Sequence, residues 1–184
     1  MAKLYFRYSA MNAGKSTALL QVAHNYEEQG QTVALFTAAV DDRYGLAKVT
    51  SRLGVSRTAE VFEANTSFQE ILPDKVACIL VDEAQFLQPE QVEELHRIAH
   101  LQSIPVICYG LRSDFLGRPF PGSSALLTLA DDLEEVKTIF ACGRKASMNM
   151  RVTETGQRVT CGSQVEIGGN NRYRSVCPRC FYST

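Results

Sequence analysis

The sequence predicts an α/β fold with a parallel sheet and helices on both faces. Roughly the first 140 residues alternate between apolar runs without polar alternation and segments with helical spacing, the pattern of a sheet covered on both sides. A glycine-containing turn, Asn12–Thr17, separates the first apolar run from the first helical segment. Because ligands bind such sheets at the carboxyl ends of the strands, this turn marks the expected site.

Five apolar runs are predicted strands: Lys3–Tyr8, Thr32–Ala38, Val76–Val81, Ile104–Gly110 and Val136–Ala141. Four segments between or after them are predicted helices: Lys15–Gln29, Ser67–Leu72, Pro89–Leu101 and Ser123–Ala130. Gly30 ends the first helix, since glycine commonly follows a helix C-terminus. Pro89 suits the first turn of the third helix, and Glu90 suits the positive end of its dipole.

Length and composition indicate one domain, or one domain with a small appendage. The chain has 184 residues, of which 45% are hydrophobic and 21% charged, as in an ordinary soluble globule. A net charge of −1 argues against a protein that coats nucleic acid, and no apolar run approaches the ~20 residues of a membrane span. Because the chain begins with a predicted strand, we expect no signal peptide and a cytoplasmic protein.

The turn Asn12–Thr17 has the chemistry of a triphosphate cradle. Backbone N–H groups at a helix N-terminus face anionic oxygens, Lys15 supplies charge for the outer phosphates, and Ser16 can bind Mg²⁺. The pattern departs from the usual phosphate loop at one position, where Ser9 replaces a glycine. The strand before the loop and the helix after it support the phosphate-binding interpretation.

Three further loops fall at the same predicted sheet edge. Asp82 ends an apolar strand, where it would face the phosphate loop and hold Mg²⁺, while Glu83 could accept a proton from an attacking hydroxyl. In Asp41–Tyr44, Arg43 either braces phosphoryl oxygens or belongs to a solvated charge cluster. Phe115 either stacks on a nucleobase or covers the core.

The six cysteines divide into two groups. Cys78 and Cys108 lie in apolar runs and are predicted core residues. The other four lie after Ala141, which favours a metal over disulfides in a reducing compartment: Cys142, Cys161, Cys177 and Cys180. Cys177 and Cys180 have the spacing of a zinc knuckle, and Cys142 is the natural third ligand. Cys161 either completes the site or is a free thiol, and we favour the free thiol.

The sequence changes character near Phe140–Cys142, which predicts two parts. Residues 1–141 would form the nucleotide-binding α/β domain, and residues 142–184 a small lobe that needs a metal because it is too short to bury a core. Within this lobe, Met148–Val152 and Arg158–Ile167 would form the two limbs of a hairpin or closed loop around a turn at Glu154–Gly156.

With these motifs in hand, the chain resembles the type II thymidine kinases, a cytosolic zinc-containing family, and looks like a bacterial member. The resemblance runs from Tyr5 to about Tyr182. Five segments carry it: Ser9–Ser16, Asp82–Phe86, Tyr109–Arg112, Cys142–Ala146, and Ile167–Gly169 followed by Tyr173.

The resemblance implies a RecA-like sheet with a zinc lobe whose "lasso" loop covers thymidine, and a kinase that transfers the γ-phosphoryl group of ATP to the thymidine 5′-hydroxyl. Glu83 matches the family's general base, and Asp82 its Walker-B acid. The implied ATP contacts are Ser9, Ala10, Met11, Asn12, Ala13, Gly14, Lys15, Ser16, Asp82, Glu83, Ala84 and Gln85. The implied nucleoside contacts are Phe115, Gln164, Val165, Glu166, Ile167, Gly168 and Tyr173.

The family also implies Mg²⁺ with ATP, a structural Zn²⁺ on Cys142, Cys177 and Cys180, a homotetramer, and feedback inhibition by dTTP. Asp41 and Arg43 match the family in residue type only. The chain departs from the family where a fourth cysteine ligand would lie two or three residues before Cys142, because Ile139 and Phe140 stand there.

Two other functions fit parts of the sequence. The segment Asp82–Gln85 resembles the Walker-B box of helicase-type motors, but those need two sheet domains, which 184 residues cannot hold. A non-catalytic zinc-ribbon adaptor for nucleic acid would fit the cysteines, but the near-neutral charge and intact Gly14–Ser16 argue against it.

Overall fold

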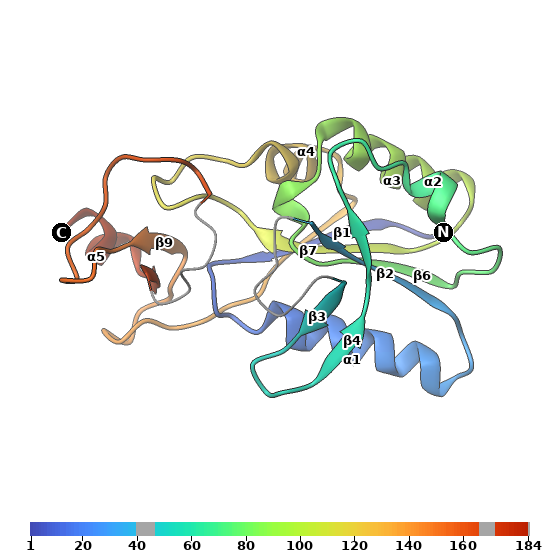
Figure 1. The fold of residues 1–184 in the computed structure, drawn as a ribbon, viewed down its shortest axis with the longest axis horizontal. Helices are drawn as coiled ribbons and strands as arrows, with labels where there is room; N and C mark the ends of the chain where they lie inside the picture. The colour runs from blue at the N-terminus through green and yellow to red at the C-terminus, as the bar shows by residue number, and fades with distance from the viewer. Residues whose placement is uncertain (40–46, 166–171, 184) are drawn as a thin grey trace.

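The protein is an α/β fold around a parallel six-stranded sheet in the computed structural model, which describes residues 1–39, 47–165 and 172–183 (Figure 1). The strand order is β5-β2-β6-β7-β1-β8, and every neighbouring pair is parallel. The strands are β1 (Leu4–Ser9), β2 (Val33–Ala38), β5 (Glu60–Phe62), β6 (Cys78–Val81), β7 (Val106–Leu111) and β8 (Asp132–Glu135). The predicted fold class is therefore confirmed.

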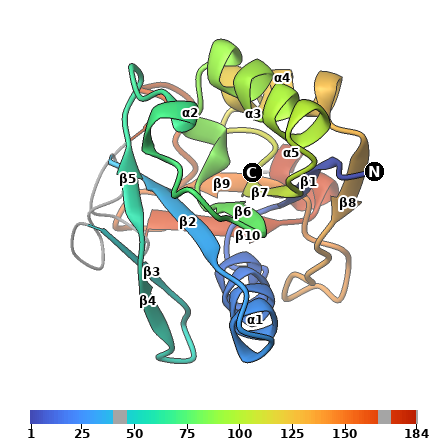
Figure 2. The same ribbon diagram turned by 90° about the vertical axis from the view of Figure 1, so that its right-hand side faces the viewer.

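Helices cover both faces of the sheet, as predicted (Figures 1 and 2). On one face lies α1 (Lys15–Glu28), whose Leu19, Leu20 and Ala23 are buried. On the other face lie α2 (Phe68–Ile71), α3 (Pro89–Leu101) and α4 (Pro121–Leu129). The central strand β6 is buried along its whole length, including Cys78, and Cys108 of β7 is also fully buried. Both cysteines are thus core residues, as expected.

One predicted strand is wrong. The segment Val136–Ala141 is not a strand, and the sheet ends instead with β8, which pairs with Tyr5–Tyr8 of β1. Only Val136 continues this pairing, through its N–H to the Tyr8 carbonyl at 2.8 Å. The apolar residues of Val136–Ala141 suggested a strand there. The true last strand, β8, lacks such a run because it is an edge strand, and edge strands in natural sheets are often short and charged. Ile139 in the predicted run is 76% exposed.

The C-terminal region forms a separate small cluster of elements. It contains β9 (Met148–Arg151), β10 (Tyr173–Val176) and α5 (Pro178–Tyr182), at the left of Figure 1. A turn closes where the sequence predicted one, with the Gly156 N–H donating to Thr153 at 2.9 Å. The predicted returning limb is confirmed at its start, where Val152 and Arg158 form an isolated antiparallel bridge and the Val159 N–H donates to the Arg151 carbonyl at 2.9 Å, but the strand that pairs with the whole of β9 is β10.

The hydrophobic core of this C-terminal region is small. Among the residues that the structure describes, four buried side chains form it: Met150, Val152, Val176 and Phe181. A cluster of this size contributes little burial energy, in line with the expectation that the region needs a metal.

Besides β8 and β10, the sequence analysis missed three further short strands among the described residues. The strands β3 (Lys48–Thr50) and β4 (Ser56–Thr58) form a hairpin outside the main sheet, and β5 is an edge strand of the main sheet. None of the helices in the described ranges is long and apolar enough to cross a lipid bilayer.

The short helix η1 (Ala84–Phe86), which follows β6, packs directly against α4. A Cβ atom added at Gly122 of α4 would lie 2.6 Å from the Leu87 carbonyl oxygen, 2.7 Å from that of Ala84 and 2.9 Å from that of Gln85. Only glycine allows this close approach. The packing of α4 against η1 in turn holds the segment after Asp82 in position.

Gly122→Ala should therefore destabilise the protein by about 1–3 kcal/mol, since backbone must move to admit the methyl group. Thermal unfolding followed by circular dichroism should show a Tm lower by roughly 2–10 °C. Ser124→Ala, at an exposed position of the same helix, is the control and should leave the Tm unchanged. An unaltered Tm in Gly122→Ala would show that α4 does not press on η1.

Candidate active site

The segment after β1 forms a phosphate-loop turn at the carboxyl edge of the sheet. Asn12 and Gly14 adopt left-handed backbone conformations, with φ of 64° and 86°, and α1 begins at Lys15. The Lys15 ammonium donates to the Ser9 hydroxyl at 2.9 Å and to the Ala10 carbonyl at 3.2 Å. The lysine thus lies back over the turn, and Ser9 occupies the glycine position as one of its partners.

A cavity of about 690 Å³ opens beside this turn. Its lining combines the loop and the start of α1 with the β3–β4 connection: Asn12–Ala18, Gln21, Thr50–Leu53 and Thr138. The exposed side of the turn therefore faces a space large enough for a nucleotide.

Asp82 follows β6 and meets the phosphate loop, as the sequence predicted. Its carboxylate accepts a hydrogen bond from the Ser16 hydroxyl at 3.1 Å and one from the Glu83 N–H at 3.0 Å. Burial raises the pKa of Asp82 above its ordinary value, and the neighbouring Glu83 charge raises it further, against the opposing effects of the Glu83 N–H, Lys15 and Ser16. A hydroxyl and a carboxylate are oxygen donors that suit Mg²⁺, and a cation would relieve this crowding of negative charge.

Glu83 has an unusual backbone, with φ of 53°. A left-handed conformation at a residue with a long side chain is uncommon, and such residues cluster at functional sites. The Glu83 carboxylate accepts a hydrogen bond from the side-chain NH₂ group of Gln85. The side-chain carbonyl of Gln85 in turn accepts from the Leu111 N–H at 3.0 Å. Gln85 is almost fully buried and fixes Glu83 relative to the end of β7.

Gly110 of β7 makes this arrangement possible. An added Cβ there would lie 2.9 Å from the Gln85 side-chain oxygen and 3.0 Å from its backbone nitrogen. The strand must therefore carry glycine where Gln85 crosses it.

The backbone of Met11 is tied to the C-terminal region. Its N–H donates to the Asn149 side chain at 2.8 Å, and its carbonyl accepts from the Ser175 hydroxyl. Asn149 is buried, and its amide also donates to the Ser113 carbonyl at 2.9 Å. One side chain of β9 thus joins the phosphate loop to the loop after β7.

Phe115 and Tyr173, both predicted nucleoside contacts, are brought together by a residue that the sequence analysis missed. The Arg151 guanidinium lies 3.8 Å from the centroid of the Phe115 ring and 5.2 Å from that of Tyr173. Two of its nitrogens donate to the Tyr173 hydroxyl, at 2.9 and 2.6 Å. Arg151 is 3% exposed, so Phe115 is covered on one face by a buried cation.

Gln164 and Val165, also predicted nucleoside contacts, lie next to this group. The Gln164 amide donates to the Asp114 carboxylate at 3.0 Å, and its backbone carbonyl is 3.4 Å from Arg151. Asp114 also accepts from the N–H groups of Leu116 and Arg118, which closes a tight loop. The Val165 carbonyl accepts from the Ser163 hydroxyl at 2.9 Å.

Five of the predicted residues lie outside the described ranges. They are Asp41 and Arg43 in the loop after β2, and Glu166, Ile167 and Gly168 before β10.

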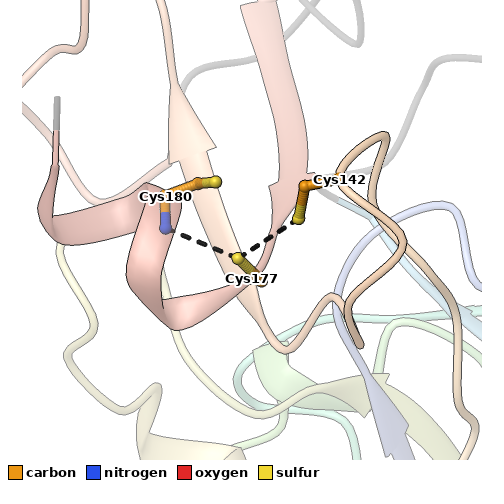
Figure 3. Close-up of side chains that lie close together, drawn as sticks. All are labelled: Cys142, Cys177 and Cys180. Atoms are coloured by element: carbon orange, nitrogen blue, oxygen red, sulfur yellow. Dashed lines mark hydrogen bonds between the residues drawn. The ribbon is translucent and has the colours of Figure 1, made fainter.

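Three of the four C-terminal cysteines come together (Figure 3). The sulfur atoms of Cys142, Cys177 and Cys180 all lie within 4.8 Å of one another, and that of Cys142 is 3.6 Å from that of Cys177. The backbone N–H of Cys180 points at the Cys177 sulfur and, with the neighbouring thiols, lowers the pKa of Cys177 to about 7. Three thiols converging at the start of a helix fit Zn²⁺, which binds thiolates.

Cys161 is exposed and does not belong to this group of sulfur atoms. The preference for a free thiol at this position is in keeping with that arrangement.

The residues missed by sequence analysis share one property: they are polar and buried. Asn149 and Arg151 alternate with Met148 and Met150 in a short strand, and Asp114 precedes Phe115. Buried asparagine and arginine need partners, so a polar residue within an apolar strand was the available signal.

Comparison with known proteins agrees with this geometry. The family model for thymidine kinase matches residues 2–181. A thymidine kinase of Chromobacterium violaceum is 59% identical over 182 residues, which is 99% of each chain. One of Albidiferax ferrireducens is 58% identical, covering 99% of this chain and 93% of its own, and one of Vibrio vulnificus is 56% identical, covering 96% and 95%. The phosphate loop, the Asp82–Glu83 pair and the cysteine cluster are thus features of a chain that belongs to the thymidine kinase family.

Proposed function

We propose that the protein transfers the γ-phosphoryl group of ATP to the 5′-hydroxyl of thymidine, giving dTMP and ADP. The single observation that carries the proposal is the contact of Ser16 with Asp82, beside Lys15 and immediately before Glu83. It assembles at one sheet edge the parts that phosphoryl transfer requires. Thymidine as the acceptor rests on membership of the thymidine kinase family.

In the proposed mechanism, the residues Ser9–Ser16 bind the ATP phosphates through backbone N–H groups. Lys15, released from Ser9 and Ala10, turns toward the β- and γ-phosphates, and Ser16 and Asp82 would hold Mg²⁺. The metal supplies positive charge that neutralises the phosphate oxygens when bound. Ala84 and Gln85 complete the ATP side by fixing the segment that carries Asp82.

Glu83 is the proposed general base. The thymidine 5′-oxygen forms a bond to the γ-phosphorus as the bond from that phosphorus to the β-phosphate oxygen breaks, and the hydroxyl proton passes to the Glu83 carboxylate. The hydrogen bond from Gln85 keeps this carboxylate in place. Arg43, outside the described ranges, would add charge to the transferring group.

The nucleoside is proposed to bind between Phe115, Tyr173 and the segment Gln164–Gly168. Arg151 supports this assignment because it holds Phe115 and Tyr173 together and reaches the Gln164 carbonyl. Backbone groups that hydrogen-bond a base discriminate sharply, since a wrong base leaves buried polar groups unpaired. Closure of the segment would exclude water and prevent wasteful ATP hydrolysis.

Four finer features belong to the same proposal. The chain divides into the nucleotide-binding domain 1–141 and the zinc lobe 142–184, as the separate C-terminal cluster of buried side chains supports. A homotetramer and inhibition by dTTP follow from the family alone. A cytoplasmic location would keep Cys142, Cys177 and Cys180 reduced and able to bind zinc.

The direct test is incubation of the purified protein with labelled ATP, Mg²⁺ and a panel of nucleosides, followed by identification of the product. We expect dTMP from thymidine and no comparable product from purine nucleosides. ATP hydrolysis stimulated by single-stranded DNA, without a nucleotide product, would contradict the proposal.

Glu83→Gln should lower kcat by about 10²–10⁴-fold, since the amide keeps the size of the side chain but cannot accept the proton. ATP affinity, measured by calorimetry, should stay within a fewfold of the wild-type value. Glu90→Gln, an exposed position a short distance along the chain, is the matched control and should not change kcat. Near-normal turnover in Glu83→Gln would remove this residue from the mechanism.

Cys142→Ser should reduce the zinc content from about one ion per chain and raise the KM for thymidine more than the KM for ATP. The reason is that Cys177 directly follows β10, so loss of the metal loosens the strand that carries Tyr173, whereas the phosphate loop is tied to β9 and β10 through Met11. Elemental analysis and steady-state kinetics measure the two effects.

Cys161→Ser is the control for that experiment and should change neither zinc content nor thymidine KM. A lower zinc content together with a higher thymidine KM in Cys161→Ser would make Cys161 the fourth ligand. Normal thymidine affinity in a zinc-free protein would contradict the proposal that the metal stabilises the nucleoside site.

A further inference from the structure

Two histidines and an aspartate meet at the edge of the sheet opposite the phosphate loop. The helix α3 starts near the carboxyl edge, after β6 and η1, and returns to the amino edge before β7, so its last turns lie near the start of β1. Figure 1 shows α3 and the N-terminus on the side of the molecule away from α5 and β9. His96 and His100 lie on these last turns, and Asp131 lies just before β8.

The three side chains converge through their ligand atoms. The Nε2 atom of His100 lies 3.1 Å from Oδ1 and 2.9 Å from Oδ2 of Asp131. The Nε2 atom of His96 lies 3.8 Å from the same Oδ1. All three ligand atoms lie within 4.8 Å of one another. In a tetrahedral zinc site with bonds of about 2 Å, neighbouring ligand atoms are roughly 3.3 Å apart, so small side-chain rotations suffice to bind an ion.

The backbone holds the carboxylate in place without a metal. Asp131 Oδ2 accepts the Leu4 N–H at 2.8 Å, and the Asp131 N–H donates to the Leu4 carbonyl at 2.9 Å. This reciprocal pair fixes the carboxylate so that both of its oxygens lie near His100 and Oδ1 also lies near His96. Hydrogen bonds that orient a metal-binding side chain are a regular part of metal sites, because they reduce the entropy lost on binding.

The helix α3 places the two imidazoles next to each other. His96 and His100 are one helical turn apart on the same face of α3, and their ring centroids lie 4.5 Å apart. Their position near the C-terminus of the helix favours a cation, since the unpaired carbonyls there carry partial negative charge. The side chains are 31% and 37% exposed, and that of Asp131 is 25% exposed, so an ion from solvent can reach them.

We propose that His96, His100 and Asp131 form a second metal site, distinct from the cysteine cluster, that binds a divalent transition-metal ion with water completing the coordination. Two imidazoles and one carboxylate suit zinc, nickel or copper, whereas magnesium and calcium prefer oxygen ligands alone. The bound ion would join the end of α3 to the start of β8 and to β1. The site lies outside the proposed catalytic machinery, so it stands or falls independently of the proposed function.

The test uses Ni²⁺ as the probe, on the full-length protein as purified, with the metal of the cysteine cluster retained. Calorimetric titration should show one Ni²⁺ bound per chain, and elemental analysis should show unchanged zinc content. His96→Gln and His100→Gln should each weaken Ni²⁺ binding more than about tenfold, and the double variant should abolish it, since loss of partners around a metal site costs at least that much.

The chain offers two matched controls. His24→Gln removes the third histidine, which lies on α1 and pairs with a carboxylate of its own helix, Glu28, at 3.3 Å. Cys161→Ser removes the exposed thiol outside the cysteine cluster. Neither should change Ni²⁺ binding. Thermal unfolding without added metal checks that each variant is folded.

A measurement on the unaltered protein avoids any dependence on variants. Because Ni²⁺ is paramagnetic, it should broaden the ring-proton NMR signals of His96 and His100 and spare those of His24. Absence of Ni²⁺ binding by the wild type, equal binding by the double histidine variant, or equal broadening of all three histidines would overturn the proposal. In each of these cases His100 and Asp131 would be an ordinary surface hydrogen-bonded pair.

Discussion

The two hydrogen bonds to the backbone of Met11 are the constraint on which most of the site depends. A backbone N–H or carbonyl removed from water must find a partner, and those of Met11 find theirs in Asn149 and Ser175, on strands far along the chain. The phosphate loop therefore takes its shape from α1 on one side and from the C-terminal region on the other. Asn149 extends the connection to Ser113, and so to the loop that carries Phe115.

This connection gives the cysteine cluster a role beyond its own region. The C-terminal region has only a small group of buried apolar side chains, so its strands depend on a further cross-link. Cys177 directly follows β10, and Cys142 lies shortly before β9, so an ion bound there joins the elements that hold Met11. Zinc at this site would thus stabilise the strands that carry part of the proposed nucleoside site. Through Met11, it would also stabilise the phosphate loop.

Electrostatics at the sheet edge points to a site prepared for cations and phosphates. Asp82 and Glu83 place two carboxyl groups side by side, and the burial of Asp82 raises the free energy of its charged form. Three groups stabilise the charged form of Asp82: the Ser16 hydroxyl, the Glu83 N–H and the nearby Lys15. The left-handed backbone of Glu83 belongs to the same arrangement, because it turns the chain directly after the residue that follows β6.

The sequence by itself determined the phosphate loop, the acidic pair after β6, the helices α1 and α3, the core cysteines and the three clustered cysteines. Each of these depends on local information: hydrophobic spacing, the glycine and proline positions that begin and end helices, or a short motif whose chemistry lies within a few residues. The carboxyl edge of the sheet also followed, since parallel strands bring their ends together wherever they stand in the order.

Only the tertiary structure decided which segments meet. The pairing of β9 with Tyr173–Val176, the choice of Asp132–Glu135 as the last strand, and the partners of Arg151 and Asn149 all join residues distant in sequence. The same holds for Asp131 with His96 and His100. Periodicity shows that a segment is a strand or that a side chain is buried, but it does not name the partner. At the edge strand β8 even the apolar signal is absent, because most of its side chains are exposed and the strand is held to the sheet by backbone hydrogen bonds and the Arg7–Glu134 ion pair.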